Sequence, residues 1–381
     1  MDSETWVDPF GRTPVWSSAG FRRVAGQLPL HEVLNLVAIR AGRPVLSAPL
    51  LRSPEPGGLR FYDVPAMIGD ERAFGDHDRL AADLADRFRA LDLEAARTKA
   101  YPSVALGTYG AHHGVVVDPA LGPDERIEVC RGLPGAVADA AAELGCASHG
   151  LLYLTDEFLD RLRPALSPQH QIAVLGAESV LECEGTGWED YVASLSSRRR
   201  GRVLKERRDY LAGPDRSHIA TGPDAIGSDL VDLRCNLRTR YGLPAERERT
   251  VLEFEALARW CGPELVVIRS LRQDEPVGFV ICLRRDETLY ARTAGFDYDR
   301  LGPKDFCYFN VVYYDALEWG LPRGVRRFEL GLAGYPAKRT RGCHFERRHG
   351  VFRLPDDESL RSALALQDRG ERARLTHECG I

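Results

Sequence analysis

The sequence lacks the features that mark several common protein classes. Its 381 residues contain no apolar run near the roughly 18–20 residues of a membrane-spanning helix, so we predict no membrane span. The first residues are acidic and polar, without the basic start and apolar stretch of a secretory signal, and we expect a cytoplasmic protein. The nine cysteines form no Cys-x-x-Cys pair and no close Cys/His group, which argues against a metal site or a disulfide scaffold. No phosphate-binding P-loop, dinucleotide-binding glycine motif or serine nucleophile elbow is present.

Length and composition indicate a globular protein with more than one domain. A chain of 381 residues can bury two separate cores, and 44% hydrophobic with 28% charged residues is ordinary for such a protein. The net charge of −5 gives no overall attraction to nucleic acid. Any contact with nucleic acid would therefore need a local basic patch.

A short loop occurs twice in the chain. Residues 121–125 read Leu-Gly-Pro-Asp-Glu and residues 301–305 read Leu-Gly-Pro-Lys-Asp. Each copy follows a strand-like run, opens a helix-like segment and leads to a second strand: 114–118, 126–144 and 151–154 in the first copy, 289–296, 306–319 and 327–330 in the second. This shared order predicts one mixed α/β fold used twice, each copy with a central sheet flanked by helices.

The domain boundaries follow from the repeat. We predict an irregular lead-in over 1–30, a first domain over 31–185, a second domain over 186–353 and a polar helical tail over 354–381. Two hairpins are expected inside these domains, one joining strands 31–40 and 44–51 and one joining strands 265–271 and 276–284.

The repeated loop is a candidate ligand site. Proline suits the first position of a helix, so Pro123 and Pro303 fit helix starts. Gly302 would let an anion approach the unpaired N–H groups there, and Lys304 favours the second copy because acidic residues crowd both turns. A plain structural turn is the alternative.

Basic residues gather in two segments of the second half. Seven lie between positions 198 and 208, and Arg198, Arg202 and Lys205 share one helix face, with Arg199 beside them. A second group follows the last core strand and includes Lys338, Arg339 and Arg341. Such segments can follow a phosphate backbone, although solvated surface arginines are the simpler interpretation.

Other chemistry-bearing residues are few. Tyr109, His112 and His113 could line a cleft for an acceptor, but the next acid, Asp118, is too far along for the His-His motif of condensation domains. Tyr290 and Arg292 alternate along a predicted strand and would share a face.

These residues together resemble a known family. Trp188-Glu-Asp-Tyr followed by Leu195-Ser-Ser-Arg-Arg-Arg is similar to the opening of the second domain in FemAB-like aminoacyltransferases, relatives of the Gcn5-related N-acetyltransferase (GNAT) superfamily. Later stretches resemble the same family: 290–295, 309–320, 328–331 and 338–342. The resemblance implies tandem GNAT-like domains and transfer of an amino acid from aminoacyl-tRNA to an amine. It also implies that Lys338 lies near the transferring group and that residues 198–208 face the donor.

The sequence is compatible with three functions. The first is an aminoacyl-tRNA-dependent aminoacyltransferase that forms an amide on a small-molecule amine, as in natural-product biosynthesis, with no bound cofactor. In this hypothesis Lys338, Tyr290 and Arg292 form the catalytic group, while Gly302, Lys304, Arg339 and Arg341 extend the tRNA surface. The second is an N-acyltransferase that uses a CoA thioester such as acetyl-CoA, although residues 300–305 depart from the superfamily's usual acetyl-CoA loop. The third is a tRNA- or nucleotide-binding module without enzymatic activity.

Overall fold

The chain forms two compact units. The computed structural model describes residues 13–71, 74 and 79–381. The first unit contains the described residues up to Glu178 together with residues 345–381, and the second unit runs from Ser179 to His344. The domain boundary predicted from the sequence lies at 185/186. Residues 345–353 were predicted to belong to the second domain, and residues 354–381 to a helical tail. They belong to the first unit because β12 (His344–Arg353) pairs antiparallel with β5 (Ser148–Leu154).

The first unit is a mixed sheet with helices. Its strand order is β1-β2-β3-β5-β12-β6, with the short β4 paired to β2. Its other strands are β1 (Glu32–Arg40), β2 (Arg43–Ser53), β3 (Ser103–Leu106), β4 (Val116–Val117) and β6 (Gln171–Glu182), whose last residues enter the second unit. Its helices are α1 (Ala19–Gln27), α2 (Val64–Ile68), α3 (Arg79–Arg89), α4 (Glu94–Lys99), α5 (Pro123–Arg131), α6 (Leu133–Glu143), α7 (Asp156–Leu162) and α15 (Glu358–Cys379).

The first predicted hairpin is confirmed. Strands β1 and β2 pair antiparallel up to Arg40 and Arg43. Ala41 and Gly42 both have positive φ, 49° and 75°, which is the backbone that a tight two-residue hairpin turn requires.

The predicted irregular lead-in is wrong where the structure describes it. Residues 1–12 lie outside the described part of the chain. Beyond them, α1 begins where the Ser18 hydroxyl accepts a hydrogen bond from the Phe21 N–H. Phe21, Val24 and Ala25 are buried, and their helical spacing is the signal in the sequence that indicates this helix.

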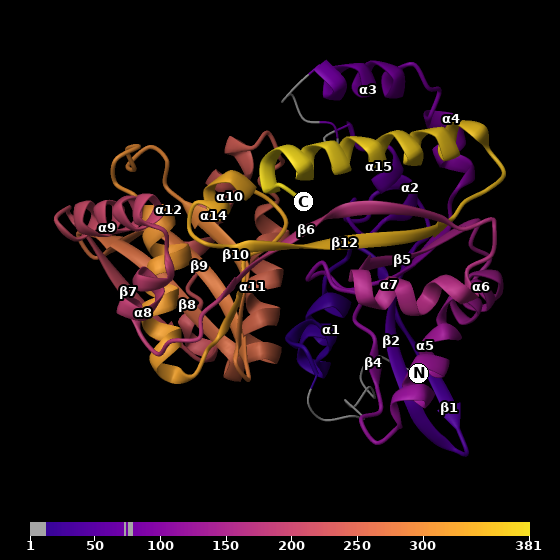
Figure 1. Ribbon diagram of the computed structural model, residues 1–381, viewed down its shortest axis with the longest axis horizontal. Helices are drawn as coiled ribbons and strands as arrows, with labels where there is room; N and C mark the ends of the chain where they lie inside the picture. The colour runs from indigo at the N-terminus through magenta and orange to yellow at the C-terminus, as the bar shows by residue number, and fades with distance from the viewer. Residues whose placement is uncertain (1–12, 72–73, 75–78) are drawn as a thin grey trace. The chain divides into compact units, whose positions relative to one another are not determined.

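The C-terminal helix is an integral part of the first unit. The helix predicted in the last residues of the chain is α15. Figure 1 shows α15 beside α3, with which it is in extensive contact. Its Gln367 amide also donates to the carbonyl oxygens of Met67 and Asp70, which lie in and just after α2. Residues 358–379 therefore stabilise the first unit rather than form a separate tail.

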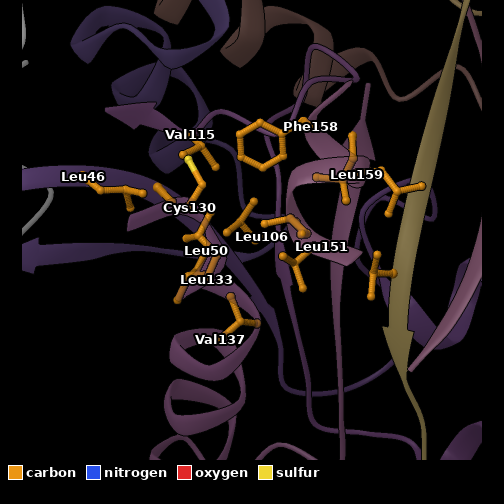
Figure 2. Close-up of a cluster of buried hydrophobic side chains, with 14 of the residues drawn as sticks. Leu46, Leu50, Leu106, Val115, Cys130, Leu133, Val137, Leu151, Phe158 and Leu159 are labelled. Carbon is orange, nitrogen blue, oxygen red and sulfur yellow. The ribbon is translucent and has the colours of Figure 1, made fainter. Parts of the chain in front are cut away.

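An apolar core fills the first unit between its sheet and helices α5, α6 and α7. Figure 2 shows side chains from the strands, such as Leu50, Leu106 and Leu151, meeting Leu133 of α6 and Leu159 of α7. All five are at most 3% exposed. Burial of this kind is the main favourable term in folding, which explains why the first copy of the repeat folds as strand, turn, helix and strand. In that copy Pro123 is the first residue of α5, as predicted.

The second unit is also a sheet flanked by helices. The last residues of β6 pair with β11, and the order continues β11-β10-β9-β8-β7. Its strands are β7 (Asp215–Thr221), β8 (Leu265–Arg272), β9 (Glu275–Arg285), β10 (Thr288–Phe296) and β11 (Arg327–Glu329). Its helices are α8 (Trp188–Ser194), α9 (Ser197–Leu211), α10 (Asp229–Arg240), α11 (Arg247–Cys261), α12 (Cys307–Phe309), a π-helical turn (Asn310–Tyr314), α13 (Asp315–Gly320) and α14 (Tyr335–Arg339).

The predicted fold class is confirmed. Both units are mixed α/β, and the second predicted hairpin forms β8 and β9 across Gln273 and Asp274, both with positive φ. None of the helices in the described part of the chain combines the length and apolar character needed to cross a lipid bilayer.

Candidate functional site

Strands β10 and β11 separate in the middle of the second unit's sheet. They pair in parallel over only three residues of each strand, ending at Tyr290 and Glu329. On its other side β10 stays paired with β9 to Phe296, with a bulge between Ala291 and Thr293. Within the described residues, the edge of β10 beyond Tyr290 has no strand beside it. An edge of unpaired peptide groups can bind an extended substrate by main-chain hydrogen bonds.

The loop after β10 is closed by its own acid. The Asp305 carboxylate accepts hydrogen bonds from the Gly302 N–H at 2.9 Å and from the Arg272 guanidinium at 2.9 Å. Phe306 then adopts a positive φ of 52°, and the helix begins only at Cys307. The prediction that Pro303 starts the helix is therefore wrong. The Gly302 N–H, predicted to meet a donor anion, already has an anionic partner, and the neighbouring Lys304 is exposed.

The first copy of the loop has the same hydrogen bond, although its helix begins at Pro123 and the second copy's begins only at Cys307. There the Gly122 N–H donates to the Glu125 carboxylate at 3.0 Å, three residues later as in the second copy. In both turns, the side chain of the acid at the fifth position of the repeat thus accepts a hydrogen bond from the N–H of the glycine at the second position. The repeated Leu-Gly-Pro sequence is explained by this turn, the structural alternative to an anion site.

Lys338 places a buried positive charge just beyond β11. It lies on α14 and is 3% exposed, and its ammonium donates to the carbonyl oxygens of Leu330 at 2.5 Å and Gly331 at 2.7 Å. Those carbonyl groups follow the last residue of β11, where β10 and β11 have already separated. Ser179 of β6 fixes the same segment by donating to the Gly331 oxygen and by accepting from the Leu330 N–H.

Tyr290 and Arg292, the other predicted catalytic residues, lie on either side of the separation. Tyr290 is 7% exposed, and burial raises the pKa of its hydroxyl to about 12, with the Glu329 carboxylate adding to the effect. Arg292 lies at the bulge and pairs with Glu253 of α11 at 2.6 Å. The structure thus brings Tyr290, Arg292 and Lys338 to the region where β10 and β11 diverge, and their catalytic roles stay predictions.

Helix α9 presents an exposed basic face. Its buried residues Val203, Arg207 and Tyr210 recur at helical spacing and pack inward. The predicted donor residues Arg198, Arg199, Arg202 and Lys205 are exposed, and no hydrogen bond or ion pair holds the three arginines within the described residues. Lys205 pairs with Asp209, and its ammonium lies 5.3 Å from the ring of Phe306, at the end of the loop after β10. The basic face is therefore beside that loop.

A buried ionic network anchors α9 to the core of the second unit. The Arg207 guanidinium donates to Asn310 and Asp315, both at 2.8 Å, and to Glu318 at 2.6 Å. Burial lowers the pKa of Arg207 and the two carboxylates raise it, with a net rise. The π-helical turn that begins at Asn310 supplies part of this network, so an irregular helix segment is matched to specific polar partners.

Arg341 belongs to the same interior, which corrects its predicted role. It is 2% exposed, it donates to Glu206 at 2.6 Å and to the Tyr314 hydroxyl at 3.1 Å, and its guanidinium carbon lies 3.3 Å from the centre of the Phe309 ring. A side chain enclosed in this way is not accessible to a phosphate backbone. Arg339, two residues earlier, is exposed and remains a candidate.

The predicted acceptor residues of the first unit are largely internal. Tyr109 is 3% exposed and its hydroxyl lies 2.9 Å from the His31 ring nitrogen. His113 is stacked between His112 and Phe158, and burial lowers its pKa well below the usual value. His112 is half-buried and accepts the Gly114 N–H, so it has the most accessible ring of the three. Their role in binding an acceptor stays a prediction.

A surface pocket of about 670 Å³ lies elsewhere on the second unit. The pocket opens at the end of the sheet where β8 begins and β9 ends, since Leu265 pairs with Leu283. The loop that follows β10 lies at the opposite end of these strands, because the last residue of β10, Phe296, pairs with Gly278 near the start of β9. Its lining is mixed: Ile219, Thr221, Pro263, Glu264, Leu265, Val266, Arg284, Asp286, Trp319 and Arg323. None of the residues predicted from the sequence lines it.

A group of charged residues on α10 and α11 was not predicted from the sequence. Arg234 and Arg238 lie on α10, Glu246 and Arg249 lie at the start of α11, and Glu253 follows one turn later. The i, i+4 spacing of Arg234 and Arg238 was the signal available in the sequence. Across the described residues, no group of three His, Cys, Asp or Glu side chains is placed to hold a metal ion.

The described chain consists of two mixed α/β units, the second with a strand pair that separates, and this is the fold class that the sequence predicted. The chain belongs to the FemAB-like family, described as peptidoglycan biosynthesis/recognition, which matches residues 124–379, more than half of the chain.

Among the solved structures that are similar to this chain, FemX shows a shared fold. FemX is similar over 92% of this chain and 96% of its own, with a TM-score of 0.57 and 9% identity. L-PGS from Bacillus licheniformis covers 70% of this chain and 83% of its own at 11% identity and a TM-score of 0.47. A tandem GNAT protein from the clavulanic acid biosynthesis pathway covers 88% and 89% at 12% identity and a TM-score of 0.44. No curated protein sequence gives a significant match.

Proposed function

We propose that this protein is an aminoacyltransferase that moves an amino acid from aminoacyl-tRNA onto an amine and forms an amide bond. The observation that carries the proposal is the exposed basic face of α9, with Arg198, Arg199 and Arg202 unengaged by the described residues and Lys205 beside the loop after β10. Membership of the FemAB-like family and the FemX-like fold support this reading.

The reaction is the aminolysis of an activated ester. The acceptor nitrogen attacks the ester carbonyl, a C–N bond forms, the bond between that carbon and the ribose oxygen breaks, and the nitrogen proton is transferred to the leaving ribose oxygen. No covalent intermediate with the protein and no external oxidant or reductant is needed. The protein must align the two substrates and stabilise the negative charge on the carbonyl oxygen.

The donor would enter along α9 and end at the separated strands. Three exposed guanidiniums on one helix suit the phosphate groups of the tRNA acceptor end. The unpaired edge of β10 suits the aminoacyl ester, which is a short extended group with hydrogen-bonding atoms. Both features belong to the second unit.

Lys338 is the candidate for stabilising the oxyanion or the leaving ribose oxygen. Its ammonium is fixed beyond the end of β11 by two carbonyl oxygens, and its burial keeps water from screening the charge. Tyr290 is the candidate for positioning the substrate, because its hydroxyl lies where β10 and β11 separate and is a hydrogen-bond donor at neutral pH.

The family description favours a peptidoglycan-precursor amine as the first acceptor to test. A small-molecule amine from a natural-product pathway, the acceptor expected from the sequence, is the second. Both acceptors use the same aminolysis chemistry, so the donor class can be tested before the acceptor is known. The cytoplasmic location follows from the tRNA donor and stays a prediction.

A binding experiment tests the donor class. The purified chain is titrated with charged bulk tRNA in a mobility-shift assay at several salt concentrations. The triple variant Arg198→Ala/Arg199→Ala/Arg202→Ala should bind at least 10-fold more weakly, and the slope of log K against log salt should fall by about 2 for three lost phosphate contacts. The matched control Arg43→Ala/Arg131→Ala/Arg369→Ala removes three exposed arginines of the first unit and should bind as the wild type does. Equal tRNA binding by both variants would contradict the proposal.

An acyl-CoA-dependent N-acyltransferase is the second candidate, and the separation of β10 from β11 is the observation that favours it. A pantetheine arm could lie along the unpaired strand edge. The capped Gly302 N–H argues against it, because the loop that would hold the pyrophosphate already carries the Asp305 carboxylate. Calorimetry with acetyl-CoA distinguishes the two candidates, since only the second predicts a saturable heat.

A further inference from the structure

Helix α10 lies directly against β10 where that strand has left β11. Gly295 makes this possible: a Cβ atom added there would lie 2.5 Å from the Leu233 carbonyl carbon and 2.6 Å from the Arg234 nitrogen. The Arg234 guanidinium reaches the Ala294 carbonyl oxygen at 3.3 Å, four residues past the last pair of β10 with β11. Its side chain is therefore held at the unpaired part of β10.

Four arginines and two glutamates form a group around this point, which we call the α10–α11 arginine cluster: Arg234, Arg238, Arg249, Arg292, Glu246 and Glu253. Glu246 pairs with both Arg238 and Arg249, and Glu253 pairs with Arg292. Within the described residues, no carboxylate lies within ion-pair distance of Arg234. Among these six side chains the arginines outnumber the glutamates by two.

The Arg234 guanidinium is poorly compensated. A guanidinium has five N–H donors, and the single hydrogen bond that Arg234 makes to the described residues is the one to Ala294. Burial lowers the pKa of Arg234 to about 10; Glu253 opposes this effect, and Arg238, Arg292 and Arg249 add to it. Arg234 nevertheless remains charged at neutral pH and only half-buried, so an anion can reach it. An anion there would supply Arg234 with hydrogen-bond acceptors and with a counter-charge.

The cluster also has the geometry of a substrate subsite. Arg292, at the β10 bulge, joins it to the strand edge that would hold the aminoacyl ester, while α10 and α11 supply the other arginines. Planar guanidiniums bind carboxylate and phosphate groups in a bidentate way, which fixes orientation as well as affinity.

We propose that the α10–α11 arginine cluster binds an anionic group of the acceptor, a carboxylate or a phosphate, and thereby orients its amine toward the donor ester. The assignment to the acceptor rests on the proposed aminoacyl transfer, whereas the anion site itself does not. Arg234 is the central residue of this site and acts as a binding and positioning residue.

The experiment measures anion binding without tRNA. Inorganic phosphate and succinate are titrated separately into the full chain by calorimetry. We expect saturable binding of at least one probe, with preference for phosphate or for succinate indicating which anionic group the natural acceptor carries. Arg234→Met should weaken binding by about 10-fold or more, since it removes charged hydrogen bonds but keeps the apolar stem. Arg234→Lys should retain part of the affinity, because the charge remains without the bidentate geometry.

Arg269→Met is the matched control. Arg269 is also half-buried and donates to a single backbone oxygen, that of Ala225 at 2.8 Å, but it lies on β8. The Arg269→Met variant should bind both probes as the wild type does. Thermal melting without probes identifies a variant that fails to fold, in which case Arg234→Lys carries the comparison.

The outcomes separate this proposal from the proposed function. Equal binding of both probes by wild type, Arg234→Met and Arg234→Lys overturns the anion site, whatever the transfer assays show. Arg234-dependent binding supports the site even if aminoacyl-tRNA proves not to be the donor. If transfer occurs, Arg234→Met should raise KM for the acceptor by about 10-fold or more, with a smaller effect on kcat, and an unchanged KM would refute the acceptor assignment.

Discussion

Removing the Glu206 carboxylate should strongly destabilise the second unit. In Glu206→Leu the enclosed Arg341 keeps three hydrogen bonds, to Tyr314, Ala337 and Thr340, but loses its counter-charge. Breaking one side of a buried ion pair costs about 3–5 kcal/mol. The retained hydrogen bonds favour the lower end of that range. The lost acceptor of the Tyr314 hydroxyl, which donates to Glu206, adds about 1 kcal/mol. We therefore expect a loss of about 4 kcal/mol in the free energy of unfolding.

Urea denaturation followed by tryptophan fluorescence measures this loss. Trp188 reports on the region, because its ring lies 5.4 Å from that of Tyr314. The double variant Glu206→Leu/Arg341→Met removes both charges and should recover most of the stability. The control Glu275→Gln breaks an exposed pair with Arg300 and should cost less than about 1 kcal/mol. A loss in Glu206→Leu no larger than in this control, or a double variant no more stable than the single one, would refute the reasoning.

Three further predictions concern acid stability, backbone packing and a helix end. Burial lowers the pKa of His149 to about 4, and His170 and Arg353 add smaller effects in the same direction. Because the folded protein holds this imidazole neutral, His149 contributes full stability above pH 6.5, and this contribution is lost as the pH falls to 4. His149→Gln should flatten the decline of the melting temperature over that range, and an unchanged profile would refute it. Gly295→Ala should cost at least 2 kcal/mol by calorimetry, because its new Cβ would meet the α10 backbone at about 2.5 Å; a wild-type melting temperature would show that α10 moves freely. Arg200→Ala should destabilise the end of α8, where Arg200 donates to three carbonyl groups, and faster amide hydrogen exchange there is the expected sign. Unchanged exchange would mean that water replaces those contacts at no cost.

The sequence predicted the local elements better than the way distant segments combine. Alternating apolar residues and turn signals defined the hairpins at Ala41-Gly42 and at Gln273-Asp274, because these depend on neighbours in the chain. The entry of β12 and α15 into the first unit could not be predicted, since it depends on pairing with β5, about 200 residues away.

The candidate site shows a similar division. The spacing of the basic residues on α9 predicted a shared face for Arg198, Arg202 and Lys205, and all three are exposed, whereas the burial of Arg207 was not predicted. The burial of Arg341 could not be read from its neighbours, because its partner Glu206 is 135 positions away. The charge of Asp305 was expected to stabilise the helix start and to repel phosphate, but its hydrogen bond from the Gly302 N–H was not predicted.

Transfer of a labelled amino acid tests the central claim most directly. Bulk tRNA charged with radiolabelled amino acids is incubated with the protein and a peptidoglycan-precursor peptide that carries a free amine, and the peptide is then separated and counted. The account predicts label in the peptide that survives mild alkali, as an amide does and an ester does not. It also predicts the loss of this label in Lys338→Ala. No transfer from charged tRNA to this or to a panel of small amines, together with transfer from acetyl-CoA, would contradict the account.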